Sequence, residues 1–244
     1  MQIFPKKDKK AEVSYFYMTG DVAKRFGIEP LHPATLQPFT PVEQPNLGCP
    51  SASNLKDRMW EQKYPLDMYI EFNKGDNLHS PEYKYRLDPV THGEPDEIKD
   101  RAVQNNIWIQ PSLDNRIVLS LAMNLVFVTD DPTIEFVVLP PQKPAMTKEC
   151  TWVTGGFHPY GWLRPFNLVW IQDKLESKSS ITMKRSDPSC TLFFNKSVNL
   201  TEITPTDKIL DYMDKTTHVL RWFQPIKNIY KIIGKTRPEY LLKK

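Results

Sequence analysis

The residues whose types and spacing best suit metal chemistry are His92, Glu94 and His158. A His-x-Glu step with a distant second histidine could present two imidazoles and one carboxylate to iron(II), leaving positions open for substrate. On a cupin-like β-barrel, this set would make the chain an iron-dependent oxygenase. Pro89 and Pro95 bracket the His-x-Glu step and predict a loop, whereas metal ligands need rigid placement. Solvated loop residues are therefore the favoured interpretation, and iron is the alternative.

A second candidate is the stretch GGFHPYGWLRPFNLVW, which runs from Gly155 to Trp170. Its first glycines predict a loop. Four of its apolar residues stand two or four positions apart and so share one face of a strand: Trp162, Phe166, Leu168 and Trp170. Arg164 could stack on an aromatic ring or bind a carboxylate. Trp162, Arg164 and Trp170 would then form the mouth of a small-ligand-binding barrel, but a loop entering a core strand is the favoured interpretation.

Other chemistries receive no support from motifs. The chain contains no G-x-S-x-G, P-loop or G-x-G-x-x-G sequence. Cys49, Cys150 and Cys190 form no C-x-x-C pair, which predicts free thiols in a reducing compartment rather than disulfides or zinc ligands. The Asp130-Asp131 pair precedes a proline between two apolar runs, and this pattern is typical of a turn rather than a metal site.

The composition describes a chain that can bury a core. Hydrophobic residues make up 40% of its 244 residues, so extensive disorder is not expected. Twenty-two prolines and only nine glycines favour short strands with stiff connections over long helices. The net charge of +3 is too balanced to indicate nucleic-acid binding. Neither a secretory signal nor a membrane span is predicted.

One charge asymmetry lies at the C-terminal end. Basic residues there are interleaved with aromatic ones, and the proposed partner-binding set is Arg221, Trp222, Lys227, Lys231, Lys235 and Arg237. Lysines that extend over the apolar face of a helix explain this pattern best. An acidic protein partner is the next interpretation, and nucleic acid is the least favoured.

The elements that would position these residues are mostly strands. Period-two alternation or β-branched apolar runs predict strands within residues 66–72, 82–87, 105–111, 116–128, 133–139, 150–155, 164–172, 179–185 and 190–195. A helix is the competing interpretation of residues 116–127. Turns are predicted at residues 129–132 and at Ser186–Ser189. Residues 51–60 predict a short helix capped by Ser51 or Ser53.

The two ends differ from this middle part. Six prolines between Pro30 and Pro50 predict an extended arm. After it, a C-terminal helix is expected to start with Thr204 as its cap and Pro205 in its first turn, followed by a second helical segment after Pro225. The predicted organisation is a Pro-rich arm at residues 1–50, a β-rich core at 51–204 and a basic helical extension at 205–244.

The order of several motifs resembles a group of uncharacterised proteins of tailed phages, notably those of marine cyanobacteria. It is also loosely similar to a bacterial family known only as a domain of unknown function. The motifs are GCPSASNLKDRMW, PLDMYIEF, VLPP, WLRPFNLVW and DPSCTLFF, between Leu47 and Thr204. The resemblance implies a viral origin and a β-rich core, and it transfers no catalytic residue. The Arg-rich arm of those relatives is not matched, and the basic tail after Pro205 is particular to this chain.

Together these observations predict a mainly β protein (α+β overall), built as a β-sandwich or jelly-roll-like barrel with a Pro-rich arm and C-terminal helices. The expected function is a non-enzymatic phage module that contacts other proteins, in the virion or during infection. Its partners would be acidic proteins or other virion proteins, with no membrane and with oligomers possible. It would be located in the host-cell cytoplasm or in the virion, and it would need no cofactor.

Overall fold

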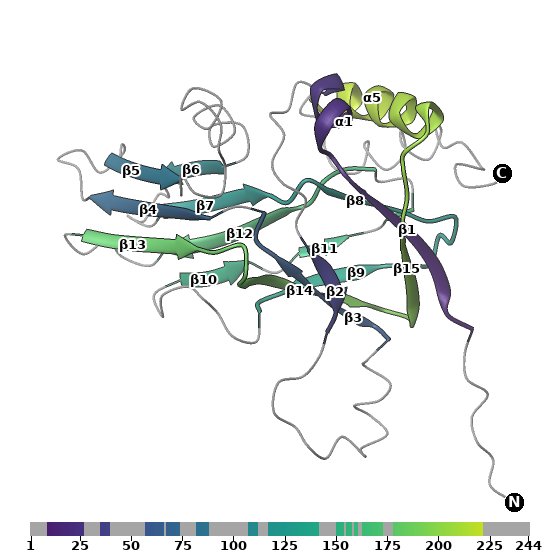
Figure 1. Cartoon of the computed structure of the whole chain (residues 1–244), viewed down its shortest axis with the longest axis horizontal. Coiled ribbons are helices and arrows are strands. Elements are labelled where there is room, and N and C mark those ends of the chain that lie inside the picture. The colour runs from purple at the N-terminus through teal and green to yellow at the C-terminus, as the bar shows by residue number, and fades with distance from the viewer. Residues whose placement is uncertain are drawn as a thin grey trace, which may run out of the picture.

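The computed structural model describes residues 9–26, 35–39, 57–65, 67–73, 82–87, 107–111, 117–141, 150–153, 155–157, 159–160, 163–172 and 178–221. These residues form a mainly β protein with several sheets, as predicted (Figure 1). The strands are β1 Ala11–Tyr17, β2 Leu36–Pro38, β3 Met59–Lys63, β4 Met68–Asn73, β5 Glu82–Leu87, β6 Ile107–Pro111, β7 Ile117–Ala122, β8 Leu125–Val128, β9 Phe136–Leu139, β10 Cys150–Val153, β11 Gly155–Phe157, β12 Asn167–Gln172, β13 Lys178–Met183, β14 Pro188–Phe194 and β15 Val198–Glu202. The helices are α1 Gly20–Arg25 and α5 Asp207–Arg221.

Four sheets contain these strands. The β1 sheet has the order β15-β1-β8, and the β14 sheet has the order β11-β9-β14-β3-β2. The β12 sheet has the order β10-β12-β7-β6, and the β4 sheet has the order β13-β4-β5. Every pair is antiparallel except β1 with β15, which run parallel with Ala11 opposite Val198.

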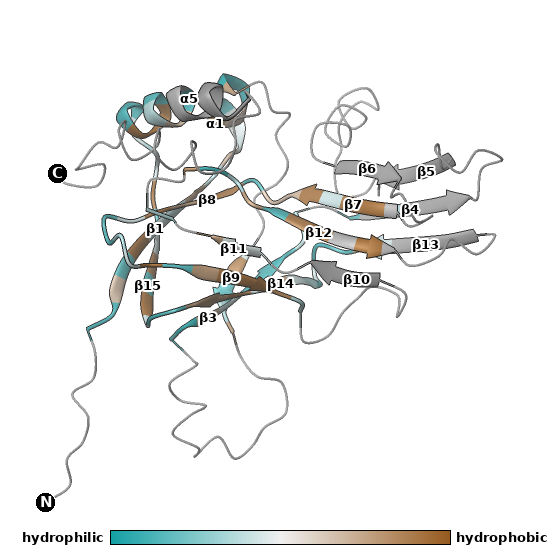
Figure 2. Cartoon of the chain, turned by 180° about the vertical axis from the view of Figure 1, so that it is seen from behind, coloured by the Kyte–Doolittle hydropathy of each residue, from teal (hydrophilic) through white to brown (hydrophobic). Residues whose placement is uncertain are grey.

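A large hydrophobic core joins these sheets. It contains Leu119 and Leu121 of β7, Met183 of β13 and Leu192 of β14, all at most 1% exposed. The β4 sheet and the β12 sheet both lie on the side of the molecule away from β1 and β15 in Figures 1 and 2. Met183, the last residue of β13, belongs to the same buried core as the β7 leucines.

Aromatic rings fill the centre of this core. The Phe127 ring lies 5.0 Å from the ring of Phe136, 5.8 Å from that of Phe194 and 6.3 Å from that of Phe166, measured between centroids. Two of these pairs are edge-on and the pair with Phe166 is stacked, and aromatic pairs in such arrangements add about 0.5–1.5 kcal/mol each beyond their burial. The interior described by the structure is therefore filled by side chains at this point.

A second, smaller core lies on the other face of the β1 sheet. It joins Phe16 of β1 and Val126 of β8 to four buried residues of α5, namely Ile209, Leu210, Tyr212 and Met213. Figure 1 shows α1 and α5 side by side above β1 and β8. The helix that the sequence predicts after residue 204 thus packs on the β1 sheet through these four residues.

The start of α5 differs from the prediction by two residues. Thr206, not Thr204, caps the helix: its Oγ1 accepts a hydrogen bond from the Ile209 N–H at 3.4 Å. The backbone oxygen of Thr206 accepts from the Leu210 N–H at 3.0 Å, which is the first helical hydrogen bond. Asp207 in the first turn places a negative charge at the positive end of the helix dipole.

Several other predictions need correction. Met59 and Trp60 belong to β3 and not to a helix, because β3 pairs with β14 on one side and with β2 on the other. The turn before β14 lies at Lys184–Asp187 rather than Ser186–Ser189, since the Asp187 N–H donates to the Lys184 oxygen at 2.9 Å. Gly155 and Gly156 form strand β11 instead of a loop.

The first fifty residues include more than an arm. Strand β1 lies at the centre of its sheet between β15 and β8, and α1 follows it. Lys10 and Asp57 form an ion pair at 2.9 Å that connects the start of β1 to the residues before β3. Most of the Pro30–Pro50 segment lies outside the described residues, and β2 is the part that the structure shows.

Residues 117–128 contain two strands rather than one, and the competing helix is wrong. The strand breaks at Asn124, which has a φ of 51°. This left-handed conformation lets one apolar run leave the β12 sheet as β7 and enter the β1 sheet as β8. The Met18 N–H donates to the Asn124 oxygen at 2.8 Å and fixes the break against the end of β1.

Substitutions at Asn124 test this break. Asn124→Val should lower the free energy of unfolding by at least about 1–2 kcal/mol, because a β-branched residue resists positive φ. Asn124→Gly should stay within about 1 kcal/mol of the wild type, since glycine adopts this φ freely but loses more backbone entropy on folding. Urea unfolding measures both values. Equal losses for both variants would show that the amide side chain, and not the backbone, governs this position.

Candidate functional site

The predicted metal ligands His92, Glu94 and His158 lie outside the described residues. The iron alternative therefore stays a prediction. Within the part of the chain that the structure describes, no group of three or more His, Cys, Asp or Glu side chains could hold a metal ion.

The predicted aromatic mouth is described only in part. Trp162 lies outside the described residues, and Trp170 is placed as a backbone position of β12 opposite Leu119. Arg164 is half-buried in the segment before β12. Phe166 and Leu168 are buried while Asn167 is exposed, so the predicted alternation is confirmed at these positions. The structure thus supports a strand that enters the core.

The predicted basic partner surface also lies mostly outside the description. Arg221 is the last residue of α5, and Trp222, Lys227, Lys231, Lys235 and Arg237 follow it. At the opposite end of α5 the exposed face is acidic: the Arg25 guanidinium forms ion pairs with Asp207 at 3.8 Å and with Asp211. Among the helices described, none is long and apolar enough to cross a membrane.

The turn between β8 and β9 confirms the prediction for Asp130-Asp131. The Thr133 N–H donates to the Asp131 carboxylate at 2.8 Å, and the Lys196 ammonium lies 3.5 Å from it. The hydrogen bonds from Thr133, followed by the charge of Lys196, lower the pKa of Asp131. The Asn195 side chain donates to the Thr133 oxygen at 2.8 Å, which ties this turn to the β14–β15 connection. Asp131 therefore stabilises the turn between β8 and β9.

Buried polar groups line the seam between β3 and β14. The Ser189 hydroxyl donates to the Gln62 backbone oxygen at 2.8 Å, where the ladder shifts register between Pro188 and Cys190. Burial raises the pKa of the Cys190 thiol from 9.0 to about 12. This thiol stays protonated at neutral pH and is enclosed, so it is not suited to nucleophilic chemistry.

The clearest surface feature is a row of residues that crosses the outer face of the β14 sheet. The register places Gly156 of β11 opposite Val137 of β9, Val137 opposite Phe193 of β14, and Phe193 opposite Met59 of β3. We call these four residues the outer row. Their sequence neighbours Val138 and Leu192 are buried. The outer row therefore lies on the face of the sheet away from the core.

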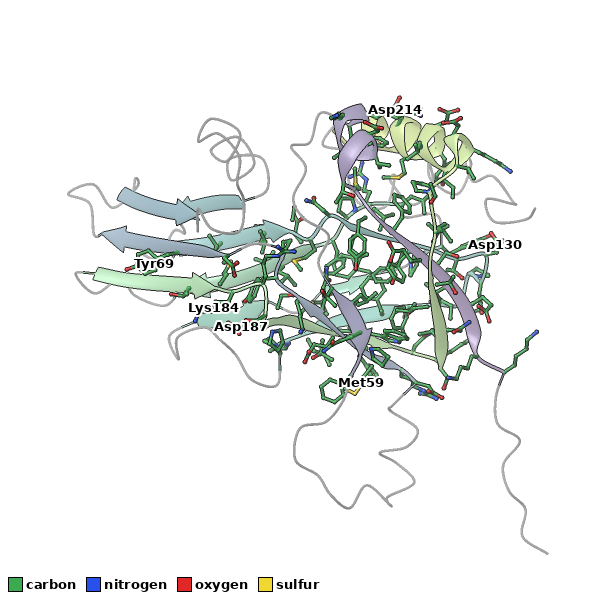
Figure 3. The ribbon with its side chains drawn as sticks, viewed as in Figure 1. Met59, Tyr69, Asp130, Lys184, Asp187 and Asp214 are labelled. Atoms are coloured by element: carbon green, nitrogen blue, oxygen red, sulfur yellow. The ribbon has the colours of Figure 1, made fainter. Side chains whose placement is uncertain are left out.

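The outer row is unusually apolar for a solvent-facing strip. Val137 is 37% exposed and is the one exposed large hydrophobic residue among those described, Gly156 is exposed, and Phe193 and Met59 are half-buried. Figure 3 shows Met59 pointing away from the sheets. On one side the strip is bordered by Gln37 and Glu61, whose side chains share a hydrogen bond of 2.9 Å. An apolar strip with a polar border is the pattern of a contact surface.

The outer row is not predicted from the sequence, because the apolar run at residues 133–139 indicates a largely buried strand. The alternation of burial in β9, where Phe136 and Val138 are buried and Val137 is not, is the signal that separates the two faces. That signal requires knowledge of which strands are paired.

Comparison with protein-family models, curated proteins and solved structures finds no match for this chain. The resemblance to tailed-phage proteins therefore stays a prediction, and the surface described above is the basis for function.

The two glycines of β11 should respond in opposite ways to alanine. A Cβ at position 155 would lie 3.1 Å from the Phe157 ring, which is stacked on Phe136 at 5.2 Å and cannot move freely. Gly155→Ala should therefore lower the free energy of unfolding by about 1–3 kcal/mol through overpacking. A Cβ at position 156 would meet no atom of the described residues within 4 Å. Gly156→Ala should be neutral or stabilising by up to about 1 kcal/mol. Chemical denaturation of both variants measures the free energy of unfolding. A similar loss at both positions would contradict the geometry.

Cys190 should not react with thiol reagents in the native protein. In a Cys49→Ser, Cys150→Ser background, a chromogenic disulfide reagent at pH 8 should label no thiol until denaturant is added. Because the folded state holds the proton between pH 9 and about 12 while the unfolded state loses it, stability should fall as pH rises through this window. Labelling of the native protein at the rate of the unfolded protein would show that the thiol is accessible.

Proposed function

We propose that this protein is a non-enzymatic module that binds another protein, encoded by a tailed phage and acting in the virion or during infection. The outer row is the observation that carries the binding function. The phage origin and setting rest on the order of sequence motifs described above.

The physical argument concerns the solvent face of the β14 sheet. Sheets with one solvated face normally alternate apolar residues inside with polar residues outside. Here three side chains in register across three strands, Val137, Phe193 and Met59, break that alternation. Their exposed surface has no role in the core, since the neighbouring positions provide the core contacts. Covering it with a partner would remove apolar surface from water.

The same proposal includes the finer description of the fold. We propose that the sheets pack as a sandwich of the jelly-roll type, in which residues of facing sheets share the large core. The parallel pairing of β1 with β15 departs from the purely antiparallel jelly roll. A sandwich of this kind offers broad sheet faces for contact with other proteins, as the outer row does.

Site-specific photo-cross-linking tests the proposal. A photoreactive phenylalanine analogue at position 137 should give one defined covalent adduct in extracts of the source organism under infection, and Phe193→Lys should abolish it. The matched control places the analogue at Thr201, an exposed position of β15, and should give no adduct.

The identity of the adduct tests the phage setting. Mass spectrometry should identify a virion protein or another protein made during infection. The same adduct from positions 137 and 201, or no adduct from position 137, would contradict a binding role for the outer row.

A further inference from the structure

Strand β11 is an edge of the β14 sheet in the part of the chain that the structure describes. It pairs with β9 along one side, and its other side pairs with no described strand. In an antiparallel pair, alternate residues direct their N–H and C=O groups away from the partner strand. An edge of this kind is a template for a further strand.

Gly156 is not explained by the fold. Its φ lies outside the left-handed region, so the backbone conformation does not require glycine. Among the described residues, no atom lies within 4 Å of a Cβ built at this position, so the packing that the structure describes does not require glycine either. Gly155 differs, because a Cβ there would press on the Phe157 ring. The fold therefore requires the absence of a side chain at position 155 and does not require it at position 156.

The open space at Gly156 lies beside an apolar neighbour. Val137 stands directly opposite Gly156 in the ladder and is exposed, and Phe193 follows on the next strand. A glycine on a strand leaves a gap over the backbone that an aromatic ring on the adjacent strand can cover. Such a ring would contact the Gly156 backbone and the Val137 side chain together.

We propose that an extended segment of the partner protein adds to the β11 edge as a strand and places an aromatic side chain over Gly156 and Val137. Main-chain hydrogen bonds to β11 provide its alignment, and the aromatic residue provides its specificity. This inference rests on the proposed function and names the chemistry of its partner. A partner helix would use the outer row but would leave the edge groups of β11 unpaired.

Selection from a random library of 12-residue peptides, displayed on their encoding messenger RNA and using the full chain as bait, tests this inference. Enriched peptides should alternate apolar residues and include an aromatic one. Synthetic copies of these peptides should slow amide hydrogen exchange at residues 155–157. Gly156→Val should weaken their binding about tenfold, because the added side chain displaces the ring. The matched control Thr201→Val, on the exposed edge strand β15, should leave binding unchanged.

The outcomes separate this inference from the proposed function. Thermal unfolding of Gly156→Val should show an intact fold, since the space around position 156 is open. Peptides that lose binding in Val137→Lys but not in Gly156→Val, without slower exchange in β11, would overturn strand addition and leave the outer row as a binding surface. No enriched peptide, or equal effects of Gly156→Val and Thr201→Val, would overturn strand addition outright.

Discussion

The structure depends on the burial of the β1 sheet on both of its faces. Strand β8 shows this constraint directly, since all four of its residues are buried. Leu125 and Phe127 belong to the large core, whereas Val126 and Val128 belong to the core beneath α5. Because successive side chains of a strand point to opposite faces, a four-residue apolar run holds two cores together. Removing either layer would expose half of β8 to water.

This constraint explains why the first and last described elements, β1 and α5, belong to the fold. Strand β1 fills the middle of its sheet, and it is held by β15 through a parallel pairing that brings residues near position 11 beside residues near position 198. Helix α5 covers the face that β1 and β8 would otherwise expose. The Arg25 ion pairs then connect α1 to α5 over this face. Described elements from both halves of the chain thus complete the β1 sheet and cover its face.

A local sequence pattern predicts a strand where apolar and polar residues alternate clearly. It fails where pairing with a distant segment determines the structure. Residues 82–87 alternate clearly and form β5 with the predicted bounds. Strand β1 buries Val13 in the large core and Phe16 in the core beneath α5, and its role depends on a partner 187 residues away. Trp60 has no local preference that excludes a helix, and its pairing with Leu192 makes it part of a strand. The break at Asn124 was not predicted, because an apolar run does not by itself indicate to which sheet each half belongs.

At the candidate site, too, the local sequence does not reveal the structural surroundings of a residue. Gly155 and Gly156 are identical in the sequence, and both predict a loop there. In the structure one glycine avoids a collision with a packed ring, while the other faces open space beside an exposed valine. Glycine costs stability in a strand, so its presence at a position where the described fold does not require it fits a constraint from outside the fold. The outer row and the β11 edge meet at that residue, and this coincidence makes strand addition the simplest source of the constraint.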